Sequence, residues 1–310
     1  MLRILYMGTP DFSVAPLRKL LENQDKYEIV AVATNKDKPV GRKQILTPSP
    51  VSLVAQEFSV SVFKYDKIRV EGVEDVKKIN PDVIITCAFG QILSQEIIDI
   101  PKYGVINIHA SILPKYRGAS PVHYAILNGE KTTGVTIMKT DIGIDTGDIL
   151  YVKKTDILDN ETTGELMDRL SIIGADAIIE SLDDIIEGKI LPVKQDDNLS
   201  TYTKIIKKQD ATIDWTKSAG DIFNHVRAYM PAPVSYTFLN GEMLKIYSVA
   251  VSNGTGKCGE IIENTGKIEV ATGNGSIIIN TLQKAGGKQM NSVDFLRGNK
   301  IEKGTILTNG

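Results

Sequence analysis

The chain has 310 residues, of which 42% are hydrophobic and 24% are charged. This balance is ordinary for a soluble globular protein and excludes a disordered or collagen-like chain, and the length predicts about two domains. The 36 Lys and Arg residues nearly cancel the 38 Asp and Glu residues, so the net charge of −2 excludes a global basic field that would draw the chain onto nucleic acid or an anionic membrane.

Cysteine usage and hydropathy indicate the compartment. The two cysteines, Cys87 and Cys258, are too few for a disulfide framework or a four-cysteine zinc site, which favours a reducing compartment. No apolar run approaches the ~18 residues of a membrane span, and the charge at Asp11 comes too early for a signal peptide. We therefore expect a cytoplasmic protein that does not enter a membrane.

The first half of the chain alternates short apolar runs with helical patterns. The expected strands are 2–7, 27–34, 81–89, 105–110, 134–140 and 149–157, and the expected helices are 11–21, 49–58, 73–79, 119–127 and 162–187. Thr9 is the expected N-cap of the first helix, with Pro10 at its first position. Strands that are apolar throughout and separated by helices are typical of a mainly parallel sheet covered on both faces. The fold class is therefore α/β.

The second half has a different pattern. A polar stretch, 188–204, is typical of a connection between domains. After it we expect one helix and then five short strands separated by turn residues: helix 218–229 and strands 234–239, 242–251, 259–263, 267–271 and 276–282. This spacing indicates a small antiparallel β-barrel. We accordingly place an N-terminal domain at 1–189, a linker at 190–204 and a C-terminal domain at 205–310.

The charge differs slightly between the two parts. From residue 205 onward there are 12 Lys and Arg residues against nine Asp and Glu residues, a net charge of +3. The sign fits a C-terminal part that touches a polyanion, but random surface scatter explains these counts equally well.

Two patterns resemble known binding motifs and fail in detail. The run GTGKCG, 254–259, matches G-x-G-x-x-G but precedes an expected strand of the all-β half, so it is a turn and not a dinucleotide site. The acidic run that begins at Asp141 looks like a calcium loop. Gly143 stands at its third position and Val152 at its twelfth, where a bidentate Glu belongs, so calcium is not expected.

The strongest chemical signal is in the expected strand 105–110. Asn107 and His109 are two residues apart, so their side chains project from the same face. Unpaired polar groups cost free energy in a core, and such residues are therefore expected at the carboxyl end of a strand, where open α/β sheets bind ligands. A lone histidine is more often structural. The neighbouring Asn107, and Asp145 in a loop with Gly143 and Gly147, favour a catalytic group here.

An amide, an imidazole and a carboxylate near one crevice suit acyl transfer to an amine. Asn107 could donate a hydrogen bond to a developing oxyanion, which is worth ~3–4 kcal/mol in comparable sites. His109 could accept or relay a proton near neutrality, and Asp145 could orient the imidazole and stabilise its cation. Since no Cys or Ser is placed recognisably as a nucleophile, direct transfer is simpler than a covalent intermediate.

These residues carry a close family resemblance. The run NIHASILPKYRG, 107–118, followed by DIGIDTG, 141–147, resembles the signature of formyltetrahydrofolate-dependent transferases. The similarity extends along nearly the whole chain to those members of the family that formylate methionyl initiator tRNA. The further matching segments are GTPDF (8–12), PVGR (39–42), PSP (48–50), IDW (213–215), LQKAG (282–286) and FLRG (295–298).

The resemblance implies a Rossmann-like catalytic domain, a linker and a C-terminal OB-like barrel that helps to hold tRNA. It implies that Asn107, His109 and Asp145 are the catalytic residues. It also implies folate-binding residues, which are Phe89, Gly90, Gln91, Ile92 and Leu93 in the wall of the pterin pocket, Ser111, Ile112, Leu113 and Pro114 in a second segment, and Asp141. One departure is visible, because the family usually has Asn-Pro-Trp-Pro where this chain has Met230-Pro-Ala232-Pro233.

The segment 35–50 is a long basic loop. A run of this kind is usually a solvated surface loop, but a loop this long on a compact domain is more often functional than idle. In the family the corresponding loop enters the acceptor stem of the tRNA, so the resemblance implies that Lys38, Arg42 and Lys43 contact RNA.

The predicted function is transfer of a formyl group from 10-formyltetrahydrofolate to the amino group of methionyl initiator tRNA, by a monomer and without a metal. One alternative is a formyltransferase that acts on a small amine, such as glycinamide ribonucleotide or an amino sugar. The C-terminal barrel, the basic loop and the lack of a glycine-rich phosphate loop after the first strand argue against it. Another is a non-catalytic tRNA-binding protein, against which the joint presence of Asn107, His109 and Asp145 argues.

Overall fold

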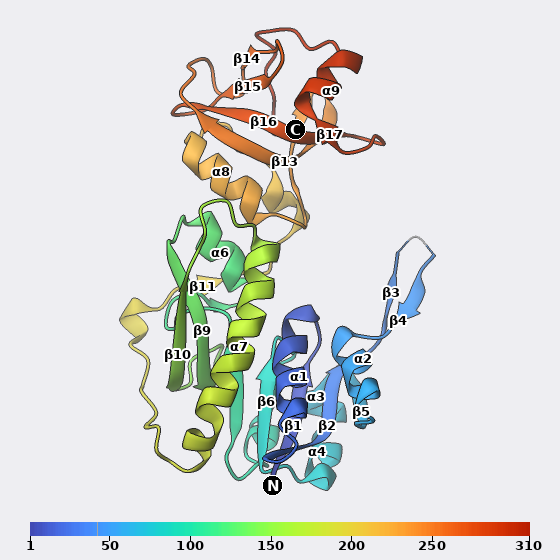
Figure 1. Ribbon diagram of the computed structural model, residues 1–310, viewed down its shortest axis with the longest axis vertical. Helices are drawn as coiled ribbons and strands as arrows, with labels where there is room; N and C mark the ends of the chain where they lie inside the picture. The colour runs from blue at the N-terminus through green and yellow to red at the C-terminus, as the bar shows by residue number, and fades with distance from the viewer. Residues whose placement is uncertain (42) are drawn as a thin grey trace. The chain divides into compact units, whose positions relative to one another are not determined.

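The structure is a computed structural model that describes residues 1–41 and 43–310. The chain divides into two compact units, each made of more than one segment (Figure 1). Unit 1 comprises 1–121, 132–156 and 167–203, and unit 2 comprises 122–131, 157–166 and 204–310. Because unit 2 takes the segments 122–131 and 157–166 from between stretches of unit 1, a single cut does not separate the units.

Unit 1 is built on a seven-stranded sheet in the order β10-β9-β7-β6-β1-β2-β5. Its strands are β1 (Leu2–Gly8), β2 (Tyr27–Asn35), β5 (Val62–Tyr65), β6 (Val83–Cys87), β7 (Val105–His109), β9 (Thr132–Lys139) and β10 (Ile149–Asp156). All neighbouring pairs from β7 to β5 are parallel, whereas β9 runs antiparallel to β7 and β10 antiparallel to β9. The predicted mainly parallel sheet is therefore confirmed.

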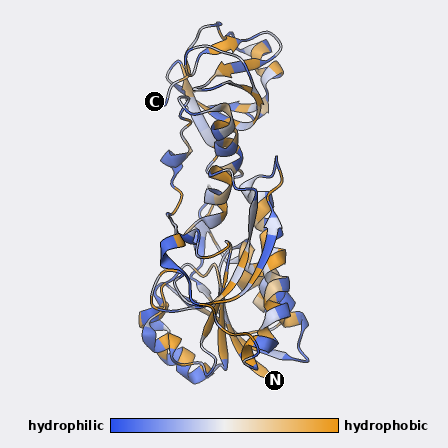
Figure 2. Ribbon diagram, turned by 90° about the vertical axis from the view of Figure 1, so that its left-hand side faces the viewer, coloured by the Kyte–Doolittle hydropathy of each residue, from blue (hydrophilic) through white to orange (hydrophobic). Residues whose placement is uncertain are grey.

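Helices pack on this sheet, and its central strands are apolar along their length (Figures 1 and 2). They are α1 (Val14–Glu22), α2 (Pro50–Glu57), α3 (Ile68–Glu71), α4 (Val73–Ile79), α5 (Gln95–Ile98) and α7 (Thr163–Ile186), whose first residues count with unit 2. Ile4, Leu5, Tyr6 and Met7 of β1 are fully buried. Burying both faces explains why these strands are apolar runs and do not alternate.

The predicted N-cap of the first helix is wrong. A 3₁₀ turn, Asp11–Ser13, precedes α1, and Thr9 makes no cap bond. Instead the hydroxyl of Thr9 donates to the carbonyl oxygen of Phe89 at 3.2 Å. The hydroxyl is engaged by a neighbouring segment, and the helix therefore starts later than local sequence rules predict.

The basic segment 35–50 is not a bare loop. It contains a short hairpin of β3 (Lys38–Val40) and β4 (Ile45–Thr47), which projects from the rest of unit 1 (Figure 1). Val40, Ile45 and Leu46 on this hairpin are exposed. With only three residues a strand and no buried face, the hairpin lacks the alternation by which strands are recognised in a sequence.

Residues 190–203 belong to unit 1 and pack against it. A 3₁₀ turn, Asp197–Leu199, leads to β11 (Tyr202–Thr203), which pairs in parallel with β8 (Arg117–Gly118). The backbone N–H of Arg117 donates to the carbonyl oxygen of Thr201 at 2.8 Å. The polar residues that make this segment resemble a linker therefore also take part in ordered hydrogen bonds with the rest of unit 1.

Unit 2 contains an antiparallel sheet in the order β12-β13-β16-β15-β14, with β17 on β16. The strands are β12 (Ser235–Leu239), β13 (Glu242–Ser252), β14 (Ile261–Glu263), β15 (Ile268–Ala271), β16 (Ser276–Lys284) and β17 (Met290–Asn291), and the helices are α6 (Pro121–Leu127), α8 (Ala219–Ala228) and α9 (Ser292–Gly298). The last residues of the chain bridge both ends of this order, since Thr308 pairs with Phe238 and Ile306 with Glu260. The sheet therefore curls into the small barrel that the sequence predicts.

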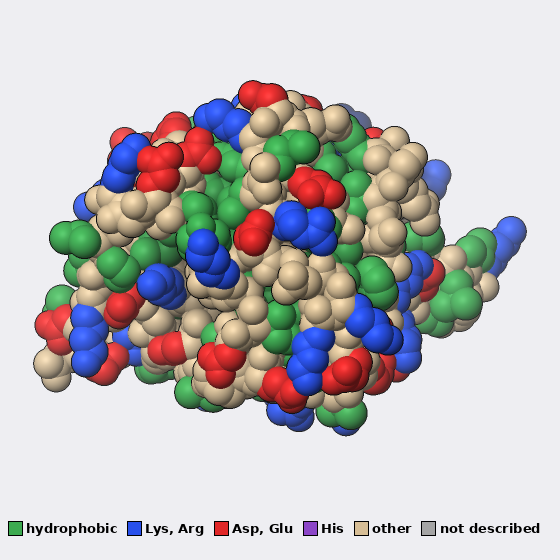
Figure 3. All heavy atoms as spheres, turned by 90° about the horizontal axis from the view of Figure 1, so that it is seen from below, with side chains coloured by type: hydrophobic (Ala, Val, Ile, Leu, Met, Phe, Trp, Pro, Cys, Tyr) green, Lys and Arg blue, Asp and Glu red, His purple; other side chains and the backbone are tan. Residues whose placement is uncertain are grey.

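The surface of unit 1 seen in Figure 3 carries acidic and basic side chains mixed together. This mixture agrees with the small net charge of the chain.

Among the described residues, no helix is both long enough and apolar enough to span a bilayer.

Candidate active site

Asn107 lies in the middle of β7, and its amide is held from one side. The hydroxyl of Thr86, the register partner of Asn107 on β6, donates to Asn107 Oδ1 at 2.9 Å. The amide oxygen is thereby occupied, and Nδ2 faces Asp145 with 3.5 Å to Oδ1. Asn107 consequently presents its N–H donors toward the polar cluster, as an oxyanion donor must.

His109, the last residue of β7, is 6% exposed and fixed by a backbone carbonyl. Its Nε2 lies 3.0 Å from the carbonyl oxygen of Tyr116. Because a carbonyl oxygen only accepts, Nε2 carries the hydrogen. In the neutral ring the lone pair is then on Nδ1, which lies 3.5 Å from Asp145 Oδ2. The nitrogen able to take a proton is therefore the one beside the carboxylate.

Asp145 reaches this place by an indirect path. Since β9 is antiparallel to β7, the end of β9 at Lys139 lies beside Ile106 and not beside His109. The following loop has to return along the sheet, and Asp145 adopts a left-handed φ of +52° in it. A Cβ at Gly147 would collide with the carbonyl oxygen of Lys139. Gly147 is thus needed for close backbone approach.

A backbone N–H holds the carboxylate itself. Gly118 N donates to Asp145 Oδ2 at 2.7 Å. The predicted catalytic residues Asn107, His109 and Asp145 therefore lie together in unit 1, although they come from a strand and a distant loop. An amide donor, an imidazole and a carboxylate in one cluster are the groups that direct acyl transfer to an amine requires.

The segment predicted to line the pterin pocket is partly committed to the fold. Phe89 and Leu93 are buried in the core, whereas Ile92 is 65% exposed. The side chain of Gln91 donates to the carbonyl oxygen of Tyr65 at 2.8 Å and accepts from the backbone N–H of Ile68 at 2.7 Å. Hence Ile92, together with backbone groups such as those of Gly90, is what this segment can offer to a ligand.

The second predicted folate segment follows β7. Ser111 is buried and donates to the carbonyl oxygen of Lys115 at 2.7 Å. The backbone N–H of Leu113 donates to Thr136 at 3.2 Å. Ile112 and Pro114 are only half-buried. The segment is thus anchored by Ser111 and Leu113, while Ile112 and Pro114 remain accessible.

Asp141 shapes the loop of Asp145. Its Oδ1 accepts from the backbone N–H of Gly143 at 3.0 Å and from the hydroxyl of Thr146 at 2.6 Å. The predicted role of Asp141 in folate binding has to coexist with this structural role.

The predicted RNA-contacting residues lie in or beside the β3–β4 hairpin. Lys38 and Lys43 are exposed, and Lys38 opens β3. Arg42 lies outside the described residues.

Sequence reasoning missed Thr86, which holds Asn107. The signal was available, because Thr86 is the one polar side chain in the run VIITC of β6, a fully buried strand. A polar residue in such a run needs a partner, and the register of a parallel neighbour supplies Asn107.

We expect Thr86→Val to reduce kcat about tenfold while the melting temperature changes little, because valine keeps the shape and removes the hydroxyl that orients Asn107. Loss of an oxyanion donor itself costs ~10²–10³-fold, so a misoriented donor should cost less. Thr133→Val, at another buried threonine of the same sheet, is the matched control. Equal kcat in both variants would show that Asn107 orients itself without Thr86.

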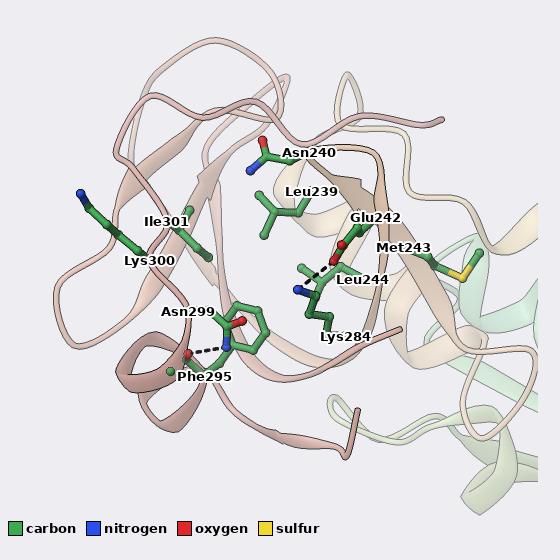
Figure 4. Close-up of a pocket in the computed structure, with 11 residues that line it drawn as sticks. Leu239, Asn240, Glu242, Met243, Leu244, Lys284, Phe295, Asn299, Lys300 and Ile301 are labelled. Atoms are coloured by element: carbon green, nitrogen blue, oxygen red, sulfur yellow. Dashed lines mark hydrogen bonds and ion pairs between the residues drawn. The ribbon is translucent and has the colours of Figure 1, made fainter. Parts of the chain in front are cut away.

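A separate hollow of about 360 Å³ lies on the barrel of unit 2 (Figure 4). Apolar side chains such as Leu239 and Phe295 line it, and an ion pair joins Lys284 and Glu242 at 2.8 Å. It contains none of the predicted catalytic or folate-binding residues, so the polar cluster in unit 1 marks the candidate active site. Within residues 1–41 and 43–310, no group of three or more His, Cys, Asp or Glu side chains is arranged to hold a metal ion.

Comparison with known protein families gives the same reaction class as this cluster of residues suggests. Residues 2–182 match the model of the formyl transferase family, and residues 205–300 match the model of the formyl transferase C-terminal domain. The chain belongs to the formyl transferase family. The resemblance inferred from the signature around Asn107 and Asp145 is thereby confirmed.

Formyl transferases from several bacteria are similar along nearly the full length. The methionyl-tRNA formyltransferase of Geobacter sulfurreducens is 46% identical over 309 residues, covering 99% of this chain and 96% of that protein. The methionyl-tRNA formyltransferase of Bacillus subtilis is 44% identical over 313 residues, covering 99% of this chain and 98% of that protein.

Solved formyl transferase structures share the fold. An N-formyltransferase from Helicobacter canadensis, solved with folinic acid and dTDP-3-aminofucose, has a TM-score of 0.70 at 24% identity and covers 92% of this chain and 100% of its own. The methionyl-tRNA formyltransferase of Clostridium thermocellum has a TM-score of 0.57 at 19% identity and covers 82% of this chain and 96% of its own. At these identities the likeness concerns the fold alone.

Proposed function

We propose that this protein transfers the formyl group of 10-formyltetrahydrofolate to the free amino group of methionine on initiator tRNA. The observation that carries the proposal is the cluster of Asn107, His109 and Asp145 in a chain that is 44–46% identical, over 99% of its length, to proteins named methionyl-tRNA formyltransferase. Formyl transfer is thus the reaction class, and the amine of a charged tRNA is the acceptor.

We propose that each of these residues takes one part of the reaction, and the geometry supports this division. The methionine amine attacks the formyl carbon, and negative charge develops on the formyl oxygen, toward which Asn107 Nδ2 can donate. His109 takes the proton that the amine loses on Nδ1, since Nε2 is held by the carbonyl of Tyr116. The carboxylate of Asp145 stabilises the resulting imidazolium. The proton can then return to the departing folate nitrogen, so the groups end as they began.

For tRNA binding we propose a division of the chain. Residues 1–189 form the catalytic domain, 190–204 the linker, and 205–310 an OB-like domain that helps to hold tRNA. The exposed lysines of the β3–β4 hairpin support contact with the acceptor stem. We further propose that the protein acts as a monomer in the cytoplasm, where charged initiator tRNA is found.

A formyltransferase that acts on small amines would have the same fold, but the relatives at 44–46% identity to this chain carry a different name. The Helicobacter canadensis protein, crystallised with an aminated sugar nucleotide, is only 24% identical to this chain. The decisive experiment is to offer the purified protein formylfolate with charged initiator tRNA and glycinamide ribonucleotide together and to identify the formylated amine. Formylation of the small amine alone would refute the proposal. A failure to turn over either amine would favour a non-catalytic tRNA-binding protein.

We expect Arg42→Ala to lower kcat/KM for the initiator tRNA about tenfold more than for a poor elongator substrate if Arg42 reads the end of the acceptor stem. An arginine fork can bind base edges bidentately, and one such contact is worth roughly 1–3 kcal/mol of discrimination. If Arg42 touches only phosphate, both substrates should suffer equally, with a salt slope shallower by roughly one.

The assay measures kcat/KM on both tRNAs at two salt concentrations. Lys78→Ala, at an exposed lysine of α4 in the same unit, controls for the loss of one positive charge. Folate binding should not change in either variant. Identical kcat/KM values for the Arg42 and Lys78 variants on both tRNAs would show that Arg42 has no part in tRNA recognition.

A further inference from the structure

Gln195 is buried in a segment whose neighbours are exposed. It is 6% exposed, whereas Val193 is 61% and Leu199 is 62% exposed. The side chain therefore turns inward from a polar stretch that connects two parts of the chain. A buried amide has to be fully hydrogen-bonded to be tolerated, so its partners indicate its purpose.

Both ends of the Gln195 amide are engaged, and two of its bonds go to the loop of Asp145. Nε2 donates to the carbonyl oxygen of Asp145 at 2.9 Å and to that of Gly147 at 2.6 Å. Oε1 accepts from Nε of Arg117 at 3.0 Å. The orientation of the amide is thus set by Arg117, since an arginine only donates.

Arg117 belongs to the signature run but points into unit 1. Its side chain is only 2% exposed, and besides Gln195 it donates to Tyr202 at 3.0 Å and to Asp197 at 2.9 Å. A guanidinium committed in this way is not free to bind a phosphate or a carboxylate of a substrate. The next residue, Gly118, donates its N–H to the carboxylate of Asp145.

Asp145 is therefore gripped at two points, its carboxylate by Gly118 and its backbone carbonyl by Gln195. It lies in a loop, in a left-handed conformation, where no strand neighbour continues the hydrogen-bond ladder. Its distance from His109 Nδ1 is 3.5 Å, so a shift of one ångström would remove it from the imidazole. Misplacements of this size can cost ~10²-fold in rate.

We propose that Gln195 is a positioning residue for formyl transfer, which holds the backbone of Asp145 so that its carboxylate faces His109. The proposal rests on the proposed function, because it assigns Gln195 a part in that reaction through Asp145. It gives the segment 190–203 a role in catalysis in addition to its role as a connection. The role of Arg117 is to fix the amide of Gln195.

The first test is Gln195→Met, which keeps the length of the side chain and removes every hydrogen bond. We expect kcat to fall about 10- to 100-fold, with KM for both substrates within about threefold and a melting temperature lower by less than about 5 °C. Lys194→Met is the matched control, because Lys194 is the preceding residue, is exposed, and receives the same methionine side chain. An unchanged kcat in Gln195→Met, or a loss confined to KM, would overturn the proposal.

The second test distinguishes action through Asp145 from a general structural effect. In single-turnover measurements the loss caused by Gln195→Met should nearly vanish in a protein that already carries Asp145→Asn, since groups that act as a unit are not additive. Losses that multiply would show that Gln195 does not act through Asp145. Should Gln195→Met fold poorly, Gln195→Glu keeps the partner of Arg117 and places a carboxylate against two carbonyl oxygens. It should reduce kcat at least as strongly, and wild-type kcat in this variant would also refute the proposal.

The proposed function and this proposal fail in different ways. A wild-type protein that does not formylate charged initiator tRNA contradicts the proposed function before any variant is made. An active wild type whose Gln195 variants keep full kcat contradicts the positioning role alone.

Discussion

We expect His109→Ala to lower kcat for formyl transfer by about 10²–10⁴-fold, equivalent to about 3–5 kcal/mol, while tRNA and folate affinities stay within about threefold. The reason is geometric. His109 ends β7 with its Nε2 held by the carbonyl of Tyr116, which leaves Nδ1 as the only ring nitrogen that can take the proton of the attacking amine. Alanine removes that acceptor and leaves the predicted tRNA-contacting residues unchanged.

The matched variant is His109→Gln. Its amide can still donate to the carbonyl of Tyr116, but it cannot relay a proton, so its kcat should be nearly as low as that of His109→Ala. Single-turnover rates measure the chemical step, and equilibrium binding measures the affinity for tRNA and for folate. If either variant retained more than about a third of wild-type kcat, His109 would have no part in the proton transfer.

The second large effect is expected for Asp145→Asn, which should lower kcat by about 10³-fold or more with only a modest change in KM for folate. The asparagine keeps an oxygen to accept from Gly118, so the loop should keep its place. It removes the negative charge 3.5 Å from His109 Nδ1, and the imidazolium formed during attack loses its partner. In serine proteases, loss of the carboxylate that faces the catalytic histidine costs ~10⁴-fold.

Asp99→Asn, at an exposed position of the same unit, is the control for removal of one charge. Steady-state kinetics, with the concentration of each substrate varied in turn, give kcat and KM separately. A defect that falls on folate KM alone would make Asp145 a ligand contact and not the partner of His109.

Local sequence was sufficient for most of the longer elements of the α/β unit, whereas the short edge strand β5 and the β3–β4 hairpin were not predicted. The runs at β1, β6 and β7 are apolar because both faces of the sheet are covered, and this pattern needs no knowledge of the fold. The barrel strands of unit 2 were likewise visible, since turn residues such as Asn240 and Gly241 separate short runs. The N-cap at Thr9 failed because its hydroxyl bonds a carbonyl 80 residues away, which no local rule contains.

In the candidate site, too, some features follow from local sequence and others do not. Asn107 and His109 could be singled out because two polar side chains on one face of an apolar strand need an explanation, and Asp145 because its glycine-spaced loop resembles a family signature. The sequence by itself therefore determined which chemical groups are present and which family the chain belongs to. Those properties depend on residue identity and short-range spacing.

Only the tertiary structure decided how these groups are oriented. The antiparallel course of β9 makes the loop of Asp145 fold back toward β7, where the backbone N–H of Gly118 meets its carboxylate, and the register of β6 against β7 brings Thr86 to Asn107. Gln195 reaches Asp145 from a stretch that reads as a polar connection. Hydrogen bonds between residues 20 to 50 positions apart depend on strand order and register, which side-chain periodicity along a single chain does not encode.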